Sequence, residues 1–170
     1  MSAEVDSYTT IESPIGPLTL IESDDSLSGV WFGDDPPSAS LAARDDDNPF
    51  LRLVVTQLEE YFAGTRYEFD LPLNAPGTSF QKRVWQMLCQ IPYGVTISYI
   101  DLAERVGSRN GARAVGLANG RNPISIVVPC HRVIGASGKL VGYGGGLPRK
   151  IALLEFEAAV RANGPQPFGG

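Results

Sequence analysis

The sequence predicts an α+β fold, with a small N-terminal α/β domain followed by a mostly helical C-terminal domain that contains a helix-turn-helix. Two observations support this prediction. β-forming residues fill much of 8–32, whereas helical patterns dominate after residue 78. Between the halves, residues 71–78 contain two prolines and a glycine, which is typical of a linker. The expected domains are therefore 1–70 and 79–170.

The balance of charge changes at the same place. Residues 1–74 contain 15 acidic and 3 basic side chains, a net charge of −12, while residues 75–170 contain 4 acidic and 11 basic side chains, a net charge of +7. This asymmetry fits a second half that binds a polyanion such as nucleic acid. It fits equally well two halves that attract each other.

The N-terminal half is expected to form strands and one helix. Its β-forming runs are bounded by turn residues, and they predict strands at 8–11, 18–22, 27–32 and 67–70. A helix is expected over 49–63, because apolar residues recur there at helical spacing and Asn48 suits the N-cap. Gly64 follows its end.

The second half is expected to form four helices and one buried strand. Thr78 and Ser98 each precede a Gln or Asp by three residues, the spacing of a capping box. The helices are predicted at 79–91, 99–106, 111–119 and from 148 onward, with Asn110 as the cap of the third. The second and third would form the helix-turn-helix. The apolar run 124–128 predicts the strand. Three residues of the last helix are expected to face the core: Ile151, Leu154 and Ala158.

Cys130 follows that strand and stands beside His131, which is the chain's single histidine, and Arg132. Positive neighbours lower the pKa of a thiol from about 8.5 and favour the thiolate, the reactive form. A buried structural cysteine with an incidental histidine remains the alternative. Cys89 is expected in the core. Two cysteines and one histidine cannot complete a zinc site without carboxylates, so no metal or other cofactor is expected.

The segment 126–134, with the sequence IVVPCHRVI, carries the most specific resemblance to a known family. Five further segments occur in the same order as in that family, at 97–99, 112–116, 119–123, 142–147 and 153–157. Together they resemble the O6-alkylguanine-DNA alkyltransferases, also called methylated-DNA–protein-cysteine methyltransferases. The resemblance covers nearly all of 79–170 and, more weakly, the N-terminal half.

The resemblance implies a ribonuclease H-like N-terminal domain without catalytic activity, and a winged helix-turn-helix in the C-terminal domain. It implies that Cys130 irreversibly accepts the alkyl group of O6-alkylguanine once per molecule, with O4-alkylthymine as a further candidate substrate. His131 would act as the base through a water, with Glu157 orienting it, and Tyr99 would donate a proton or a hydrogen bond to the guanine ring. Without the resemblance, Glu157 would pass for a solvated helix charge and Tyr99 for a packed tyrosine.

The resemblance also implies that duplex DNA binds to the helix at 111–119 and that the damaged base leaves the stack. Arg113 would fill the vacated place, and small residues would let the helix approach the minor groove; phosphate contacts and tight packing inside the protein are the alternatives. The expected DNA-contacting residues are Arg113, Ala112, Gly116, Arg109 and Arg121. The residues expected to brace or wall the base pocket are Asn122, Tyr143, Gly144 and Gly145.

The expected partner is therefore double-stranded DNA containing O6-alkylguanine, bound by a monomer. The sequence does not decide whether monomers assemble cooperatively along DNA. The sequence has neither a signal peptide nor a membrane-length apolar run, so a cytoplasmic protein is expected. One alternative is a non-enzymatic alkyltransferase-like DNA-binding protein, but those proteins replace the acceptor cysteine. The other is a cysteine hydrolase, which would need a histidine placed by the fold rather than one adjacent to the cysteine.

Overall fold

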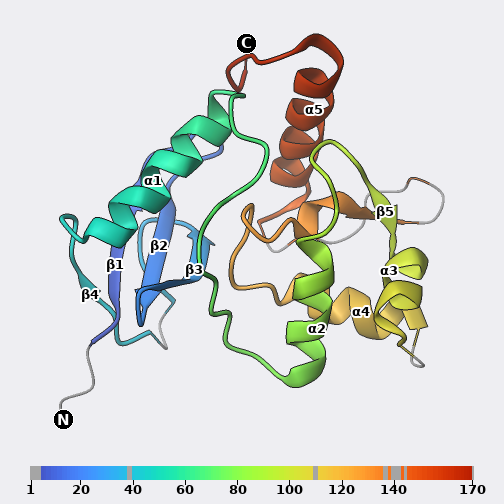
Figure 1. Ribbon diagram of the computed structural model, residues 1–170, viewed down its shortest axis with the longest axis horizontal. Coiled ribbons are helices and arrows are strands. Elements are labelled where there is room, and N and C mark those ends of the chain that lie inside the picture. Colours follow the sequence, from blue (N-terminus) through green and yellow to red (C-terminus); the bar gives the residue numbers. More distant parts are fainter. Residues whose placement is uncertain are drawn as a thin grey trace. The chain divides into compact units, whose positions relative to one another are not determined.

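The computed structural model describes residues 5–37, 40–108, 111–135, 138, 143 and 145–169 (Figure 1). The described chain forms two compact units. The first contains the residues up to Ala75 together with those from Pro165 onward, and the second runs from Pro76 to Gly164. Compared with the expected domains, 71–75 and 165–169 go with the first unit. The predicted α+β fold class is confirmed.

The first unit is built on a four-stranded sheet with the order β3-β2-β1-β4. Its strands are β1 (Ser7–Ile11), β2 (Leu18–Ser23), β3 (Ser26–Phe32) and β4 (Ala43–Arg44). The first three pair antiparallel, with Thr9 opposite Leu20 and Leu20 opposite Val30, and they confirm the three strands predicted in this region. The short β4 lies where no strand was expected and pairs parallel with β1.

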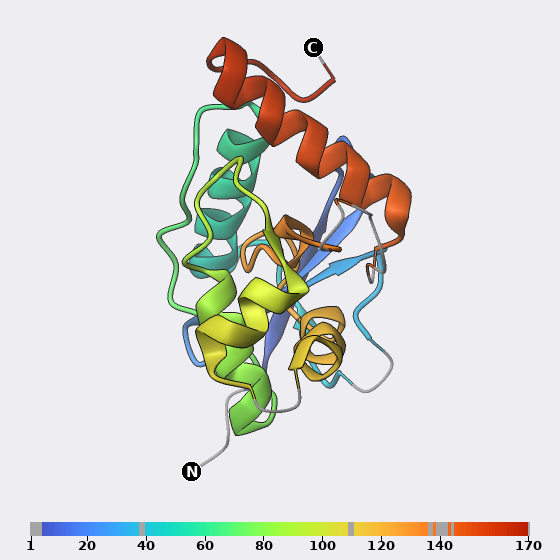
Figure 2. The ribbon, with the colours of Figure 1, turned by 90° about the vertical axis from the view of Figure 1, so that its right-hand side faces the viewer.

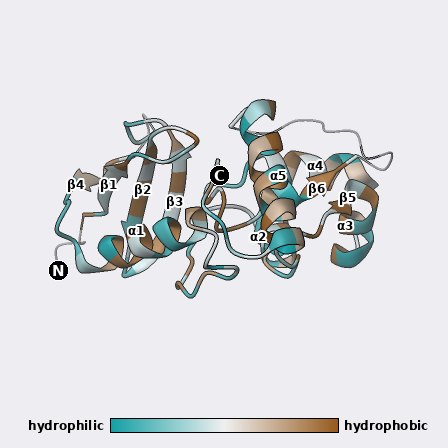
Figure 3. Ribbon diagram, turned by 90° about the horizontal axis from the view of Figure 1, so that it is seen from above, coloured by the Kyte–Doolittle hydropathy of each residue, from teal (hydrophilic) through white to brown (hydrophobic). Residues whose placement is uncertain are grey.

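Helix α1 (Pro49–Phe62) covers one face of this sheet (Figure 1). It begins where the sequence predicts, because the Asn48 side chain accepts a hydrogen bond from the Leu51 amide at 3.0 Å. Hydrophobic residues concentrate on the strands and on one side of the helix (Figure 3). The core of this unit includes Leu18, Leu20, Leu27, Val30, Leu51, Val54, Leu58 and Tyr61.

The strand predicted at 67–70 is wrong. The backbone of Asp70 pairs instead with the side chain of Gln57 on α1, which accepts from the Asp70 amide at 2.9 Å and donates to its carbonyl at 3.1 Å. A buried side-chain amide therefore satisfies the backbone groups that a neighbouring strand would otherwise satisfy. Further along, the Phe168 amide donates to the Phe62 carbonyl at 2.8 Å, so the C-terminal residues pack on the end of α1.

The second unit contains helices α2 (Ser79–Leu88), α3 (Tyr99–Val106) and α4 (Gly111–Gly120). Both predicted capping boxes are present, at Thr78 and at Ser98, so local sequence determines both helix starts. Helices α3 and α4 pack side by side, as the helix-turn-helix requires (Figure 2). The Trp85 indole of α2 donates to the Ala118 carbonyl at 2.8 Å and ties α2 to α4. The expected cap of α4, Asn110, lies outside the described residues.

The segment 124–128 is buried as predicted, but it is not a strand. The Asn122 side chain donates to the Val128 carbonyl at 2.8 Å and accepts from the Ile124 amide at 2.9 Å, which folds the segment into successive turns. Ile126 consequently has φ +72°, a conformation that is costly for a β-branched residue. The turns lead into a 3₁₀ turn, η1 (Cys130–Arg132).

A two-residue parallel ladder joins β5 (Ile97–Ser98) to β6 (Val133–Ile134) and brings the start of α3 beside the end of η1. The last helix is α5 (Leu147–Asn163). Its predicted core face is wrong, because Ile151 and Ala158 are exposed and Leu154 is half-buried. The buried residues are Lys150, Leu153, Phe156, Glu157 and Val160. Within the described part of the chain, we find no helix with the length and apolar character to cross a membrane.

Candidate functional site

Cys130 opens η1 and is 4 % exposed. Its amide donates to the Val128 carbonyl at 2.8 Å, and its carbonyl accepts from the Asn119 side chain at 3.3 Å. The backbone that carries the thiol is therefore held by the turn before it and by helix α4. Asn122 also helps to position Cys130, because its hydrogen bonds hold the turns that precede the cysteine in the chain.

The electrostatics of the thiol differ from the prediction. Burial raises the pKa of the Cys130 thiol to about 11, although Asn122, Lys150 and nearby backbone amides partly oppose the shift. The expected lowering of this pKa by adjacent positive charges is therefore wrong for the protein without DNA. The reason is desolvation, which disfavours the charged form of a buried thiol. The resting thiol is protonated at neutral pH, so a reaction at this sulfur needs a base.

His131, the next residue in the chain, pairs with α5. The Glu157 carboxylate accepts a hydrogen bond from His131 Nε2 at 2.8 Å, and both side chains are at most 1 % exposed. The alternative of a solvated helix charge is thus wrong for Glu157. The other ring nitrogen, His131 Nδ1, is buried and has no hydrogen-bond partner among the residues that the structure describes. Since buried polar atoms are normally paired, this nitrogen marks a place for a water or a ligand atom.

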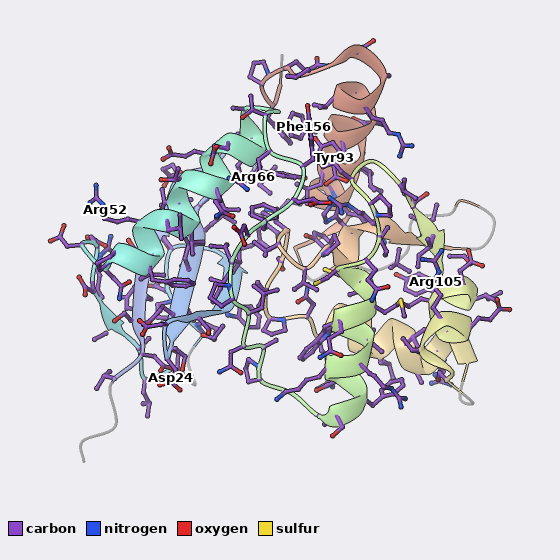
Figure 4. All side chains as sticks on the ribbon, in the orientation of Figure 1. Asp24, Arg52, Arg66, Tyr93, Arg105 and Phe156 are labelled. Carbon is purple, nitrogen blue, oxygen red and sulfur yellow. The ribbon has the colours of Figure 1, made fainter. Side chains whose placement is uncertain are left out.

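The Arg132 guanidinium binds Glu157, and Arg132 is not among the groups that lower the pKa of the Cys130 thiol. Its guanidinium donates to both carboxylate oxygens, at 2.8 and 3.0 Å, and to the Ile91 carbonyl at 2.8 Å. The guanidinium also lies 5.5 Å from the ring centroid of Tyr93, which is labelled in Figure 4. Burial opposes ionisation of Glu157, but His131 and Arg132 outweigh it and hold the pKa of this carboxyl well below its usual value.

Tyr99 is the first residue of α3, and its ring packs over α4. A Cβ atom placed on Gly116 would lie 3.7 Å from the ring, an ordinary van der Waals distance. Burial raises the pKa of Tyr99, the Cys130 thiolate would raise it further, and Asn119 lowers it. The structure thus brings this predicted residue into the surroundings of Cys130.

Lys150 is a site residue that the sequence analysis did not identify. It is completely buried, and its ammonium donates to the Val133 carbonyl at 2.7 Å and lies 5.8 Å from the ring centroid of Tyr99. Burial lowers the pKa of Lys150, and the Cys130 thiolate would oppose that shift. A sequence signal does exist, because Lys150 and Glu157 are seven residues apart and so share one face of α5.

The DNA-contacting residues expected on α4 differ in their surroundings. Arg113 and Arg121 are exposed, and Ala112 and Gly116 are half-buried. Leu117 is 63 % exposed and follows Arg113 by one turn, so this face is not as flat as the small residues suggested. Arg109 lies outside the described residues.

Among the expected pocket residues, Tyr143 and Gly145 are described and Gly144 is not. Burial raises the pKa of the Tyr143 phenol far above its usual value, and the Cys130 thiolate would raise it further. The Gly145 carbonyl accepts from Arg149 at 3.1 Å. Cys89 is exposed at the end of α2, so the expectation that it belongs to the core is wrong. The described residues contain no group of three or more His, Cys, Asp or Glu that could hold a metal ion.

Comparison with known proteins adds to this geometry. Residues 79–159 match the family model described as 6-O-methylguanine DNA methyltransferase, DNA binding domain. Residues 7–75 match the model of its ribonuclease-like domain, which confirms the fold expected for the N-terminal half.

Individual relatives agree over most of their length. The methylated-DNA–protein-cysteine methyltransferase of Mycobacterium tuberculosis is 53 % identical over 150 residues, which cover 88 % of this chain and 91 % of the relative. The protein of the same name from Methanosarcina barkeri is 48 % identical over 151 residues, covering 88 % and 96 %. The crystal structure of Mycobacterium tuberculosis OGT in complex with DNA superposes with a TM-score of 0.83 and 52 % identity, over 90 % of this chain and 93 % of that one.

Proposed function

Because this chain belongs to the methylated-DNA–protein-cysteine methyltransferase family, a group of DNA-repair alkyl transferases, we propose that Cys130 is its alkyl acceptor. The acceptor sulfur would take the alkyl group from guanine O6 in duplex DNA, and O4-alkylthymine would be a secondary substrate. The observation that carries this proposal is the buried arrangement of Cys130, His131 and Glu157, in which the thiol is protonated at rest and a base stands beside it.

The thiol proton leaves first. It moves through a water bound at His131 Nδ1 to the imidazole, and Glu157 stabilises the imidazolium that forms. The orphaned Nδ1 atom supports this route, because adjacent side chains rarely reach each other directly. Arg132 keeps Glu157 ionised and fixed, so that the proton remains on His131 rather than on the carboxylate.

The thiolate then displaces the base in line. The S–C bond forms while the C–O6 bond breaks, and the electron pair of that bond passes to the guanine. Tyr99 gives its hydroxyl proton to the ring nitrogen N3, which neutralises the leaving base, and the imidazolium later returns a proton to the phenolate through solvent. The product is a thioether, whose C–S bond is stable under physiological conditions. Each molecule therefore acts once.

The DNA-binding surface would be α4. Arg113 is exposed on this helix, so it can enter the duplex and occupy the place of the extruded base. The half-buried Ala112 and Gly116 keep the helix slim beside it, and Arg121 supplies a phosphate contact at the end of the helix. The excess of basic residues in 75–170 supports binding through this half of the chain.

The test uses a duplex with one O6-methylguanine. Intact-mass spectrometry should show one added methyl group per protein molecule, and peptide mapping should locate it on Cys130. Cys130→Ala should bind the same duplex and gain no mass, whereas Cys89→Ala, the matched control, should be methylated like the wild type. Repair of more than one lesion per molecule, or methylation of another residue, would refute the proposal.

A further inference from the structure

The side-chain amide of Asn119 lies between the two groups that the proposed reaction uses. Asn119 is on α4, is 4 % exposed, and donates to the backbone carbonyl of Cys130 at 3.3 Å. The same side chain lowers the pKa of Tyr99, as an amide that donates toward the phenol oxygen does. One planar amide thus binds the residue that would accept the alkyl group and favours the ionised form of the residue that would protonate the base.

From this geometry we infer that Asn119 is a positioning residue, which aims the Tyr99 hydroxyl at the base and stabilises the negative charge left on the phenol oxygen. This inference rests on the proposed function. An amide N–H suits the task, because it donates to a phenolate at least as well as to a phenol. The amide has two N–H groups, so it can serve the Cys130 carbonyl and the Tyr99 oxygen together.

The packing of α3 on α4 supports the assignment. Gly116 and Asn119 are three residues apart and therefore share one face of α4. Gly116 lies against the edge of the Tyr99 ring, while Asn119 approaches its hydroxyl. Gly116 thus holds the edge of the ring, and the amide one turn later is placed toward its polar end.

The electrostatic surroundings show why such a donor matters. The phenol of Tyr99 is half-buried, and a thiolate at Cys130 opposes a second negative charge nearby. The Asn119 side chain favours the phenolate. The Lys150 ammonium lies 5.8 Å from the ring centroid and is hydrogen-bonded to the Val133 carbonyl.

A second feature of Asn119 points to a ligand. Its acceptor atom, Oδ1, is buried and has no partner among the residues that the structure describes. A buried amide oxygen without a partner is unusual, because the loss of its hydrogen bonds to water is not compensated. The extruded guanine carries an exocyclic amino group next to N3, the atom that Tyr99 would protonate. That amino group could donate the hydrogen bond that the Asn119 Oδ1 atom would otherwise not receive.

The experiment is a double-mutant cycle on the single-turnover rate, measured at saturating O6-methylguanine duplex. Asn119→Leu removes the polar atoms with little change in volume, and Tyr99→Phe removes the hydroxyl. We expect N119L to slow methyl transfer about 10- to 100-fold, the effect of losing a hydrogen bond to a charged group. In the Y99F background the same change should slow methyl transfer by a clearly smaller factor, less than about 5-fold, because the hydroxyl that Asn119 positions is gone and only the contact of Oδ1 with the base is lost.

The controls separate the two proposals. Duplex affinity and the melting temperature of each variant are measured alongside, and Asn119→Ser replaces N119L in the cycle if the leucine variant does not fold. Equal slowing in both backgrounds would show that Asn119 acts through the Cys130 backbone and would overturn the inference. An unchanged N119L rate, or a Y99F rate equal to that of the wild type, would overturn it too. If wild-type protein gains no methyl group at all, it is the proposed function that fails.

Discussion

Replacing Arg132 with leucine should destabilise the protein far more than the same change at an exposed arginine. The Arg132 guanidinium makes two hydrogen bonds to the Glu157 carboxylate and one to the Ile91 carbonyl, and Glu157 is 1 % exposed. R132L would leave that carboxylate buried with fewer donors. Removal of one partner of a buried ion pair costs about 3 to 5 kcal/mol. For a chain of this size that corresponds to a melting temperature lower by about 6 to 20 °C.

The measurement is urea unfolding at neutral pH, together with a thermal melt. Arg121→Leu is the matched control, because Arg121 is exposed and its loss should change the free energy of unfolding by less than about 0.5 kcal/mol. Adding Glu157→Gln to R132L should restore part of the lost stability, since the buried charge is then absent. An R132L variant that melts within about 2 °C of the wild type, or no recovery in the double variant, would refute the reasoning.

The loss of stability in R132L should also depend on pH, because it depends on whether Glu157 is ionised. The pKa of Glu157 is well below its usual value in the folded protein, so its ionisation stabilises the fold above about pH 4.3. That contribution is lost as the pH falls from there toward the folded pKa. R132L should have a less depressed pKa at Glu157 and should lose less on acidification. The difference in the free energy of unfolding between wild type and R132L should therefore narrow from pH 7 to about pH 3.5.

Three further predictions concern single positions. In a Cys89→Ser variant, the rate at which iodoacetamide alkylates Cys130 should keep rising with pH until about 11, the pKa to which burial raises this thiol; a rate that levels off below about pH 8 would contradict this. Because the folded pKa is raised, stability should also fall as the pH rises from about 9 to about 11. Lys150→Met should shift the pH dependence of alkylation upward and slow methyl transfer at least about tenfold, because it removes a cation that favours the thiolate; an unchanged pH dependence would exclude this role. Gly116→Ala should raise the free energy of unfolding by about 0.5 to 1 kcal/mol and weaken duplex binding. Gly120→Ala, whose added Cβ would lie in open space, is the control for stability. A loss of stability in G116A would show that the Tyr99 ring leaves no room for the added methyl group.

Features that depend on residues close together in the chain could be predicted from the sequence. The Asn48 cap and the capping boxes at Thr78 and Ser98 were predicted correctly, because each joins groups about three residues apart. The three N-terminal strands followed from runs of β-forming residues between turns. The family resemblance, carried by the segment around Cys130, is confirmed as well.

Features that depend on distant partners were decided by the tertiary structure. The segment 124–128 has strand-like composition, but the Asn122 amide supplies hydrogen bonds that fold it into turns. The buried face of α5 carries Lys150 and Glu157 because Val133, His131 and Arg132, all from another part of the chain, satisfy their charges. The contacts of the Arg132 side chain and the raised pKa of the Cys130 thiol also depend on packing against distant parts of the chain. The sequence shows which charged residues are adjacent to a thiol. Only the packed structure shows which way those side chains point and how much water remains around the sulfur.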